Sequence, residues 1–225
     1  MINYQIISTG SKGNAVVIED IILIDCGVPF SKLENVFSKL QIVLLTHIHS
    51  DHFNARTIRK LHKTRPALRF VCCEWLLEPL IEAGISRRQI DVVKVGSKYS
   101  YGGFSISPVL LYHNVKQCGY RVYIKNQKVF YATDTNTLEG ITAEGYDLYL
   151  IEANYEDNEI QERIAEKTEK GEYAYEYEVL KNHLSLAKAE KFIADNIKDN
   201  GVYVLIHGHE AKEKMNEEKK GGMTY

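Results

Sequence analysis

Three of the eight histidines lie close together, in the segment Thr46-His47-Ile48-His49-Ser50-Asp51-His52. This segment directly follows the apolar run at residues 41–45, which has the length of a buried strand. His47 and His49 are two residues apart, so they share a side if the backbone there is still extended. Imidazole and carboxylate groups together suit zinc, with iron and manganese as alternatives. We therefore expect a metal site in the turn after this strand.

Further candidate ligands each follow another predicted strand: His113, Asp134 and His207. Polar residues at the ends of buried strands need partners, because an unpaired buried charge is costly. Taken singly, each of the three is more often a structural hydrogen-bonding group than a ligand. Taken with the first cluster, they exceed the four positions of a tetrahedral site, which favours two metals.

The elements that must position these residues are short strands and interspersed helices. Strand-like apolar runs are most frequent in the first half of the chain, and turn residues separate them. Helical spacing of apolar residues predicts helices at 31–40, 54–63, 74–83, 159–170 and 185–196. The pattern does not alternate strictly, so it favours sheets covered by helices over a parallel βαβ fold.

Composition excludes several classes of protein. The 225 residues are 44% hydrophobic and 26% charged, as in globular domains and unlike disordered chains or fibres. A formal charge of −2 argues against a strongly basic nucleic-acid-coating protein. The four cysteines form no Cys-x-x-Cys pair, so we expect buried, reduced thiols. No apolar run approaches the roughly 20 residues of a membrane span, and no leader is recognisable, so we expect a cytoplasmic protein without a membrane segment.

The segment from His47 to His52 resembles the signature of the metallo-β-lactamase fold. Four later pieces arrive in the order seen in its phosphodiesterase branch, which includes ribonuclease Z: 132–135, 150–153, 182–185 and 205–207. The opening at residues 8–14, the Glu-Ala-Asn piece and the His-Leu-Ser piece are most similar to the YycJ (WalJ) subgroup, whose members are regarded as DNA exonucleases. The resemblance extends from Ile2 to about His209.

This resemblance implies a four-layer αββα sandwich of the α+β class, with the site at one edge of two sheets. It also implies a complete ligand set, in which Asp134 bridges two metals. The ligands of one metal would be His47, His49 and His113, and those of the other Asp51, His52 and His207. His209 is the alternative to His207.

For catalysis, the resemblance implies that His183 is the general acid and that Glu152 orients it, while Asp51 counts both as a ligand and as a catalytic residue. Two divalent ions, zinc first and manganese second, would make hydroxide available near neutral pH. A basic alkoxide leaving group needs a proton, which a histidine whose pKa lies near neutral pH can supply. The pair of Glu152 and His183 therefore favours phosphodiester cleavage over lactam or thioester cleavage.

The substrate stays open between three hypotheses. The first is a YycJ-like exonuclease acting on nucleic acid, on DNA rather than RNA. The second is a cyclic-nucleotide phosphodiesterase of the anti-Pycsar type. The third is a metal-bound interaction or regulatory protein without catalysis, against which the complete ligand set argues.

Two groups of side chains bear on this choice. A basic run could contact phosphates or simply be a solvated helix face: Arg56, Arg59, Lys60, Lys63 and Arg65. Four tyrosines could stack on bases, pack as a lid or make a homodimer contact: Tyr155, Tyr173, Tyr175 and Tyr177.

We expect a single domain at 1–209 with a lid-like insertion at 156–180, and a charged, disordered tail at 210–225. The loop Gly10–Asn14 is expected to be a tight turn, either alone or with hydrogen bonds to the Asp51 region.

Overall fold

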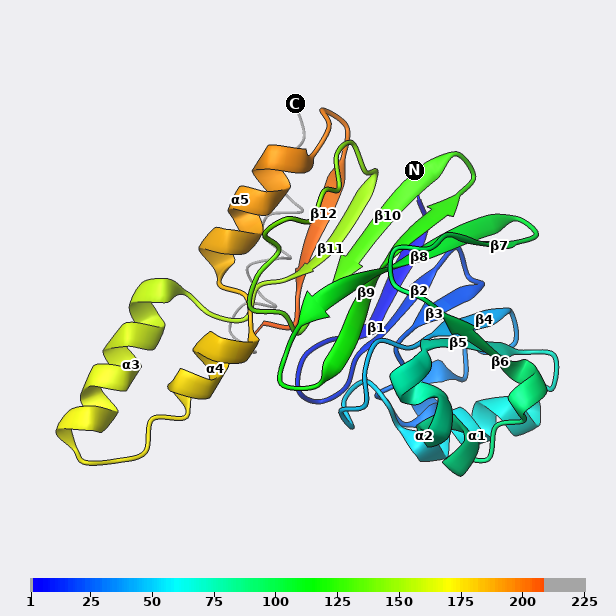
Figure 1. Ribbon diagram of the computed structural model, residues 1–225, viewed down its shortest axis with the longest axis horizontal. Helices are drawn as coiled ribbons and strands as arrows, with labels where there is room; N and C mark the ends of the chain where they lie inside the picture. The colour runs from blue at the N-terminus through cyan, green and yellow to red at the C-terminus, as the bar shows by residue number, and fades with distance from the viewer. Residues whose placement is uncertain (1, 209–225) are drawn as a thin grey trace. The chain divides into compact units, whose positions relative to one another are not determined.

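The computed structural model describes residues 2–208 and contains two six-stranded sheets and five α-helices in that range (Figure 1). The chain divides into two compact units. Unit 1 comprises the chain up to Leu110 together with Val115–Lys125, and unit 2 comprises Leu111–Asn114 and the chain from Asn126 onward. The mixed class of sheets and helices that the sequence predicts is confirmed. His209 and the tail at 210–225 lie outside the described residues, and the single domain stays a prediction.

The first sheet has the strand order β1-β2-β3-β4-β5-β6. Its strands are β1 (Tyr4–Ser8), β2 (Ala15–Ile18), β3 (Ile22–Ile24), β4 (Ile42–Leu44), β5 (Arg69–Cys73) and β6 (Ile90–Val93). The pairs β1–β2 and β2–β3 are antiparallel, and the pairs from β3 to β6 are parallel. Parallel strands place their carboxyl ends at the same edge, so the residues that follow β3 and β4 come together.

The second sheet has the strand order β12-β11-β10-β9-β8-β7. Its strands are β7 (Tyr99–Tyr101), β8 (Phe104–Tyr112), β9 (Lys116–Ile124), β10 (Gln127–Ala132), β11 (Leu148–Glu152) and β12 (Val202–Ile206). The strands β10, β11 and β12 run parallel, with Ala132 opposite Ile151 and Glu152 opposite Ile206. The residues just beyond these three strands therefore meet at one edge of unit 2.

The helices of unit 1 partly match the prediction. Helix α1 (Ala55–Thr64) begins where expected, because the Asn54 side chain accepts the Thr57 backbone N–H. The predicted helix at 31–40 is wrong: only the 3₁₀-helix η1 (Phe30–Leu33) forms, followed by turns. Backbone hydrogen bonds in this segment mostly span three residues, so the buried apolar side chains are presented by tighter turns.

The remaining short helices of unit 1 lie in two places. The 3₁₀-helix η2 (Glu74–Leu76) leads directly into α2 (Leu77–Glu82), which packs on β6. The 3₁₀-helix η3 (Arg87–Gln89) precedes β6. The helix predicted at 74–83 therefore consists of a 3₁₀-helix of three residues and an α-helix of six.

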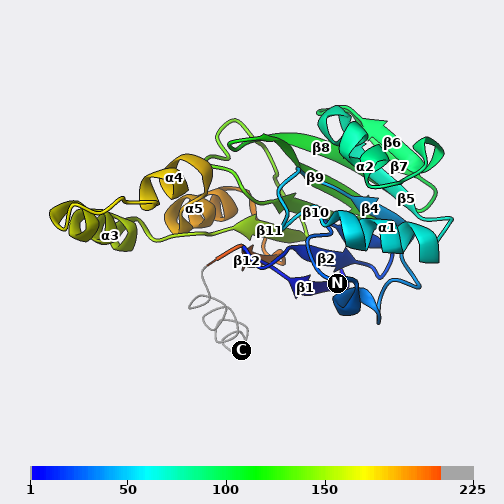
Figure 2. The ribbon, with the colours of Figure 1, turned by 90° about the horizontal axis from the view of Figure 1, so that it is seen from below.

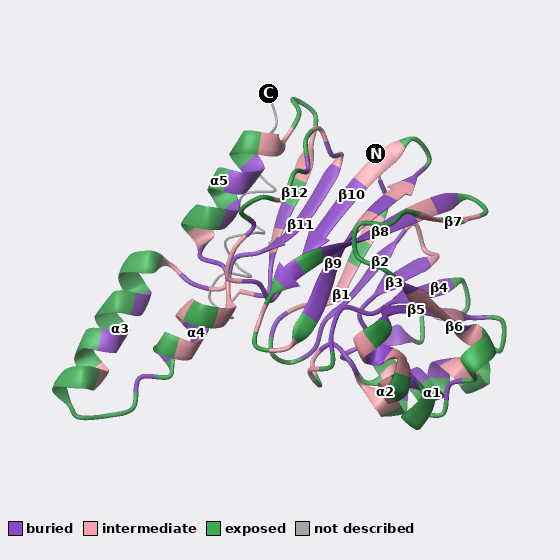
Figure 3. Cartoon of the chain, in the orientation of Figure 1, coloured by how far each residue is buried: buried purple, intermediate pink, exposed green. Residues whose placement is uncertain are grey.

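Unit 2 contains α3 (Asp157–Glu169), α4 (Glu176–Asn182) and α5 (Leu186–Asn196). Helix α5 packs on β11, and the side chains of Tyr155, Ile160, Ile164, Ala174 and Val179 form a small core beneath α3 and α4. In both ribbon views, α3 lies farther from the strands of this unit than α4 and α5 do (Figures 1 and 2). Figure 3 shows β11 buried along its length, whereas most of α3 is exposed. The sequence did not predict α4, because two turns are too short for a periodicity signal.

All four cysteines have free, buried thiols, as the sequence predicts. Burial raises the pKa of Cys72 to about 12, so this thiol stays protonated near neutral pH. Among residues 2–208, no helix has both the length and the apolar character needed to cross a membrane.

Candidate metal centre

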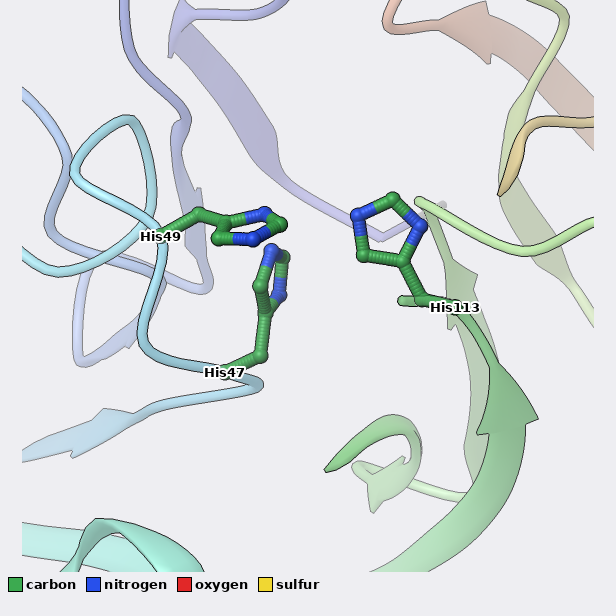
Figure 4. A group of neighbouring side chains, drawn as sticks. All are labelled: His47, His49 and His113. Carbon is green, nitrogen blue, oxygen red and sulfur yellow. The ribbon is translucent and has the colours of Figure 1, made fainter. Parts of the chain in front are cut away.

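The loop His47–His52 follows β4 and brings its donor atoms together within unit 1. His47 and His49 present ring nitrogens within 4.8 Å of one another, and their rings meet edge to face. Figure 4 shows these two side chains on their loop, and His113 at the end of β8. The ring of His47 also lies against that of His52, whose Nε2 is 3.5 Å from an oxygen of Asp51. Four candidate ligands of the sequence analysis are thus neighbours here.

Asp25 orients two of these histidines from behind the loop. Its carboxylate accepts the backbone N–H and the hydroxyl of Thr46, at 3.0 and 2.9 Å. It also lies 2.7 Å from Nδ1 of His52. A carboxylate only accepts hydrogen bonds, so Nδ1 of His52 carries the proton and Nε2 keeps its lone pair.

The same reasoning extends to His47 through Thr46. The Thr46 hydroxyl uses its single hydrogen to donate a hydrogen bond to Asp25. It therefore accepts the hydrogen bond from Nδ1 of His47, 2.9 Å away. Nε2 of His47 is then a lone-pair donor as well. A ring whose other nitrogen donates to a neighbouring oxygen is the usual state of a metal-binding histidine.

Sequence reasoning missed Asp25 as a residue of the site. It follows the apolar strand β3, has a left-handed φ of 59°, and its backbone N–H donates to the carbonyl of Leu44. The parallel pairing of β3 with β4 puts Asp25 beside Thr46. An acidic residue at the end of an entirely apolar strand is the signal that could have found it.

The loop Gly10–Asn14 supports the histidine loop directly. The Asn14 backbone N–H donates to the carbonyl of Asp51 at 2.6 Å, and its side-chain amide lies 2.8 Å from Nε2 of His52. Of the two alternatives for this loop, a turn alone and a turn with hydrogen bonds to the Asp51 region, the structure has the second.

Gly27 allows the histidine loop to approach this support. A Cβ atom built on Gly27 would lie 1.7 Å from the carbonyl oxygen of Asp51. We expect Gly27→Ala to push the loop away, to destabilise the fold by about 1–3 kcal/mol and to weaken zinc binding. Denaturant unfolding and a zinc titration check both effects. Gly103→Ala is the matched control, since a Cβ there meets nothing within 4 Å. Equal behaviour of the two variants would contradict this account of the loop.

The second group of candidate residues gathers in unit 2, and we call it the strand-end cluster: His113, Asp134, Glu152, His183 and His207. Ligand atoms of Asp134, Glu152, His183 and His207 all lie within 4.8 Å of one another. An oxygen of Asp134 is 3.4 Å from Nε2 of His207 and 3.9 Å from Nε2 of His113. Every residue that the sequence analysis placed at these strand ends is therefore brought to the same edge.

Two members of this cluster have unusual backbones. Asp134 and His207 are left-handed, with φ of 53° and 56°, although neither is a glycine. Such a conformation costs about 1–3 kcal/mol and persists where the surroundings impose it. It turns the chain at the end of β10 and β12, which directs both side chains to the shared edge.

Glu152 and His183 form a tight pair. Nδ1 of His183 lies 2.6 Å from one carboxylate oxygen, and the other oxygen accepts the backbone N–H of Thr135 at 2.9 Å. Glu152 is completely buried, and this burial raises its pKa, although the hydrogen bond from His183 opposes the rise. An anionic Glu152 stabilises a protonated imidazole, so the pair can store and deliver a proton.

His113 is oriented by the backbone of α4. Its Nδ1 donates to the carbonyl oxygen of Asn182 at 2.9 Å. Nε2 of His113 is thereby left with its lone pair, as in His47 and His52. Each unit therefore offers imidazole nitrogens in the ligating form together with carboxylate oxygens, which fits zinc or manganese.

The basic run of the sequence is partly structural. Arg59 and Arg65 donate to the carbonyls of Ala83 and Leu40, and the Lys60 ammonium lies 4.1 Å from the ring centre of Phe30. These three side chains hold α1 in place. Arg56 and Lys63 are exposed and lie two turns apart on α1.

The tyrosines divide in a similar way. Tyr173, Tyr175 and Tyr177 are exposed by 76%, 59% and 49%. Tyr155 is buried in the core under α3, so the interpretation that it stacks on bases is wrong.

Comparison with known proteins identifies the family. The protein-family model described as the beta-lactamase superfamily domain matches residues 21–207 of this chain. No curated protein matches significantly.

Three solved structures show the fold. YhfI of Bacillus subtilis, a metallo-β-lactamase fold protein, is 18% identical, with a TM-score of 0.73 over 97% of this chain and 91% of that one. Human tRNase Z, short form, is 16% identical, with a TM-score of 0.71 over 95% and 94%. Zinc-bound PqqB of Methylobacterium extorquens is 10% identical, with a TM-score of 0.66 over 98% and 96%.

The fold predicted from the sequence is thus confirmed as the metallo-β-lactamase fold. Together with the matched family model, it establishes that this chain belongs to the beta-lactamase superfamily, whose members are mostly metal-dependent hydrolases.

Proposed function

We propose that this chain is a dinuclear metal-dependent phosphodiester hydrolase that acts on nucleic acid, similar to the YycJ exonucleases. The observation that carries the proposal is the hydrogen bond between His183 and the buried Glu152, next to Asp134. A thioester loses a weakly basic thiolate, so its hydrolysis has less need of such a proton donor. A nucleotide 3′- or 5′-alkoxide does need one.

The proposed ligands follow from the family resemblance and from the ring states described above. His47, His49 and His113 would hold one metal, Asp51, His52 and His207 would hold the other, and Asp134 would serve both. Zinc is the first choice and manganese the second, because the donors are imidazoles and carboxylates. When bound, two such ions supply hydroxide near neutral pH and neutralise charge on the phosphate.

The chain's own residues supply the rest of the mechanism. His183, held by Glu152 through Nδ1, delivers a proton from Nε2 to the leaving oxygen. Glu152 keeps the imidazole in the correct orientation and stabilises its charged form. Asp25 and Thr46 keep His47 and His52 in the ligating state.

Nucleic acid is the proposed substrate for two reasons. Human tRNase Z, which has a similar fold, is named for activity on a nucleic acid. Arg56 and Lys63 are exposed cations on α1, the helix that directly follows the histidine loop. DNA is preferred over RNA, and a cytoplasmic location is proposed, because of the YycJ resemblance.

The second candidate is hydrolysis of a cyclic nucleotide. The exposed tyrosines at 173, 175 and 177 favour it, because they could stack on one base. Tyr173 and Tyr175 precede α4, and Tyr177 lies in its first turn. A comparison of a linear duplex, a single strand and 3′,5′-cyclic nucleotides, each with zinc and with manganese, separates the candidates. Hydrolysis of the cyclic nucleotide alone would replace the first proposal with the second, and no hydrolysis of any of them would contradict both.

A salt series tests the interaction of α1 with the polyanion. We expect kcat/KM on a DNA duplex to fall steeply with salt, and the double variant Arg56→Gln, Lys63→Gln to flatten this slope by about one for each phosphate that it no longer neutralises. Hydrolysis of a nitrophenyl phosphodiester should be unchanged. Arg88→Gln, Lys94→Gln removes the same charge elsewhere on unit 1 and is the control. Equal slopes for both double variants would exclude α1 as a phosphate-binding element.

A further inference from the structure

Helix α4 ends in two carbonyls that each accept a hydrogen bond from a side chain outside the helix. The Lys181 carbonyl accepts from the Asn136 side-chain amide at 2.8 Å, and the Asn182 carbonyl accepts from Nδ1 of His113 at 2.9 Å. The last carbonyls of a helix have no partner within it, so these bonds contribute to holding the end of α4, together with the bonds from His183 and Leu184 to Glu152.

Asn136 belongs to the loop after β10 and lies two residues beyond Asp134. This loop is held by the bond from the Thr135 N–H to Glu152, at 2.9 Å, and by the bond from the Asn136 N–H to the Tyr112 carbonyl, at 3.1 Å. The Lys188 ammonium lies 3.3 Å from the Asn136 carbonyl. The Asn136 amide therefore projects from a segment whose backbone is fixed on several sides.

The end of α4 in turn orients two rings of the strand-end cluster. The Asn182 carbonyl accepts a hydrogen bond from Nδ1–H of His113, which leaves Nε2 of that ring with its lone pair. The next residue is His183, whose backbone N–H bonds to Val179 and whose ring bonds to Glu152. A displacement of the end of α4 would move both rings at once.

We infer that Asn136 is a positioning residue: by fixing the end of α4, its amide sets the ring of the ligand His113 and the ring of the proton donor His183. The assignment of these two roles rests on the proposed function. A ligating histidine depends on the oxygen that holds its other nitrogen, and the loss of such a partner typically weakens metal binding by 10- to 100-fold. Asn136 acts one bond further away, so we expect a loss of about 10-fold.

Asn136→Asp tests the inference, because aspartate has the same size and cannot donate to the Lys181 carbonyl. We expect about 10-fold weaker zinc binding in a competition titration against a chelator. We also expect a changed Nδ1–H signal of His113 in the NMR spectrum of ¹⁵N-histidine-labelled protein without metal. Asn136→Ala is the second variant if the aspartate prevents folding.

Asn196→Asp is the matched control. The Asn196 amide also donates to a carbonyl near the end of its helix, that of Phe192 at 2.8 Å, and makes no contact with the strand-end cluster in the described structure. A positioning residue must change zinc affinity and the imidazole signal, whereas a purely structural amide lowers the melting temperature only. If Asn136→Asp matches Asn196→Asp in affinity and spectrum, the inference is overturned.

Activity gives a separate readout. On substrates with an alkoxide leaving group, Asn136→Asp should lower kcat more than on a nitrophenyl phosphodiester, since His183 is displaced. Weaker zinc binding with a changed His113 signal, in a protein that hydrolyses no phosphodiester, would support the positioning of His113 and reject the proposed function. The two failures are thus distinguishable.

Discussion

His183→Ala should lower turnover of a nucleic-acid phosphodiester by roughly 10²- to 10⁴-fold, the usual contribution of a general acid. The imidazole is held at 2.6 Å by the buried Glu152, so its removal leaves an alkoxide to depart without a proton. On a nitrophenyl phosphodiester, which has a good leaving group, the loss should be much smaller. Steady-state kcat on the two substrates, with metal content measured on the same samples, checks this prediction.

Two comparisons make the result specific to proton transfer. His62→Ala removes a histidine of α1 that lies outside both ligand clusters, and it should leave kcat unchanged. Glu152→Gln keeps the size of the side chain and removes its charge, and it should lower kcat on the alkoxide substrate in the same direction as His183→Ala. An equal loss on both substrates would mean that His183 positions the substrate and does not protonate the leaving group.

Asp134→Asn should have the largest effect on metal content. Wild-type protein purified without chelator is expected to hold about two equivalents of divalent metal, because the donors exceed one tetrahedral site. A bridging carboxylate serves both ions, so its neutralisation should reduce the content to below one equivalent. Elemental analysis of zinc and manganese checks this.

Asparagine is the informative substitution at this position. Asp134 has a φ of 53°, which asparagine tolerates and alanine adopts at a cost of about 1–2 kcal/mol. Asp147→Asn neutralises a carboxylate of the same unit that pairs with Lys198, and it should keep both metals. A wild-type content near zero, with no activity restored by zinc or manganese, would reject the dinuclear proposal.

Local sequence was sufficient for much of the fold and for the residue types of the site. A buried strand must end in residues that can face solvent or a partner, so polar side chains after β4, β10 and β12 stood out against apolar runs. The cap at Asn54 was readable as well, because capping depends on residues within one turn. Helix α4 was not predicted, because two turns of chain carry too weak a periodicity. The helical spacing at 31–40 was misleading, because the segment buries its apolar side chains from a 3₁₀-helix and turns.

The candidate ligands and their places just after strands follow from the residue order alone, as does His183 as the candidate proton donor, which lies directly after helix α4. Which ring nitrogen of a histidine carries the proton depends on tertiary contacts. The Asp25 carboxylate accepts a hydrogen bond from His52, 27 residues later in the chain. The Asn182 carbonyl accepts one from His113, 69 residues earlier. The contact of Asp25 depends on the pairing of β3 with β4 and on the left-handed turn at Asp25. The ring states of His52 and His113 follow from hydrogen bonds to partners distant in sequence, and no local pattern specifies those partners.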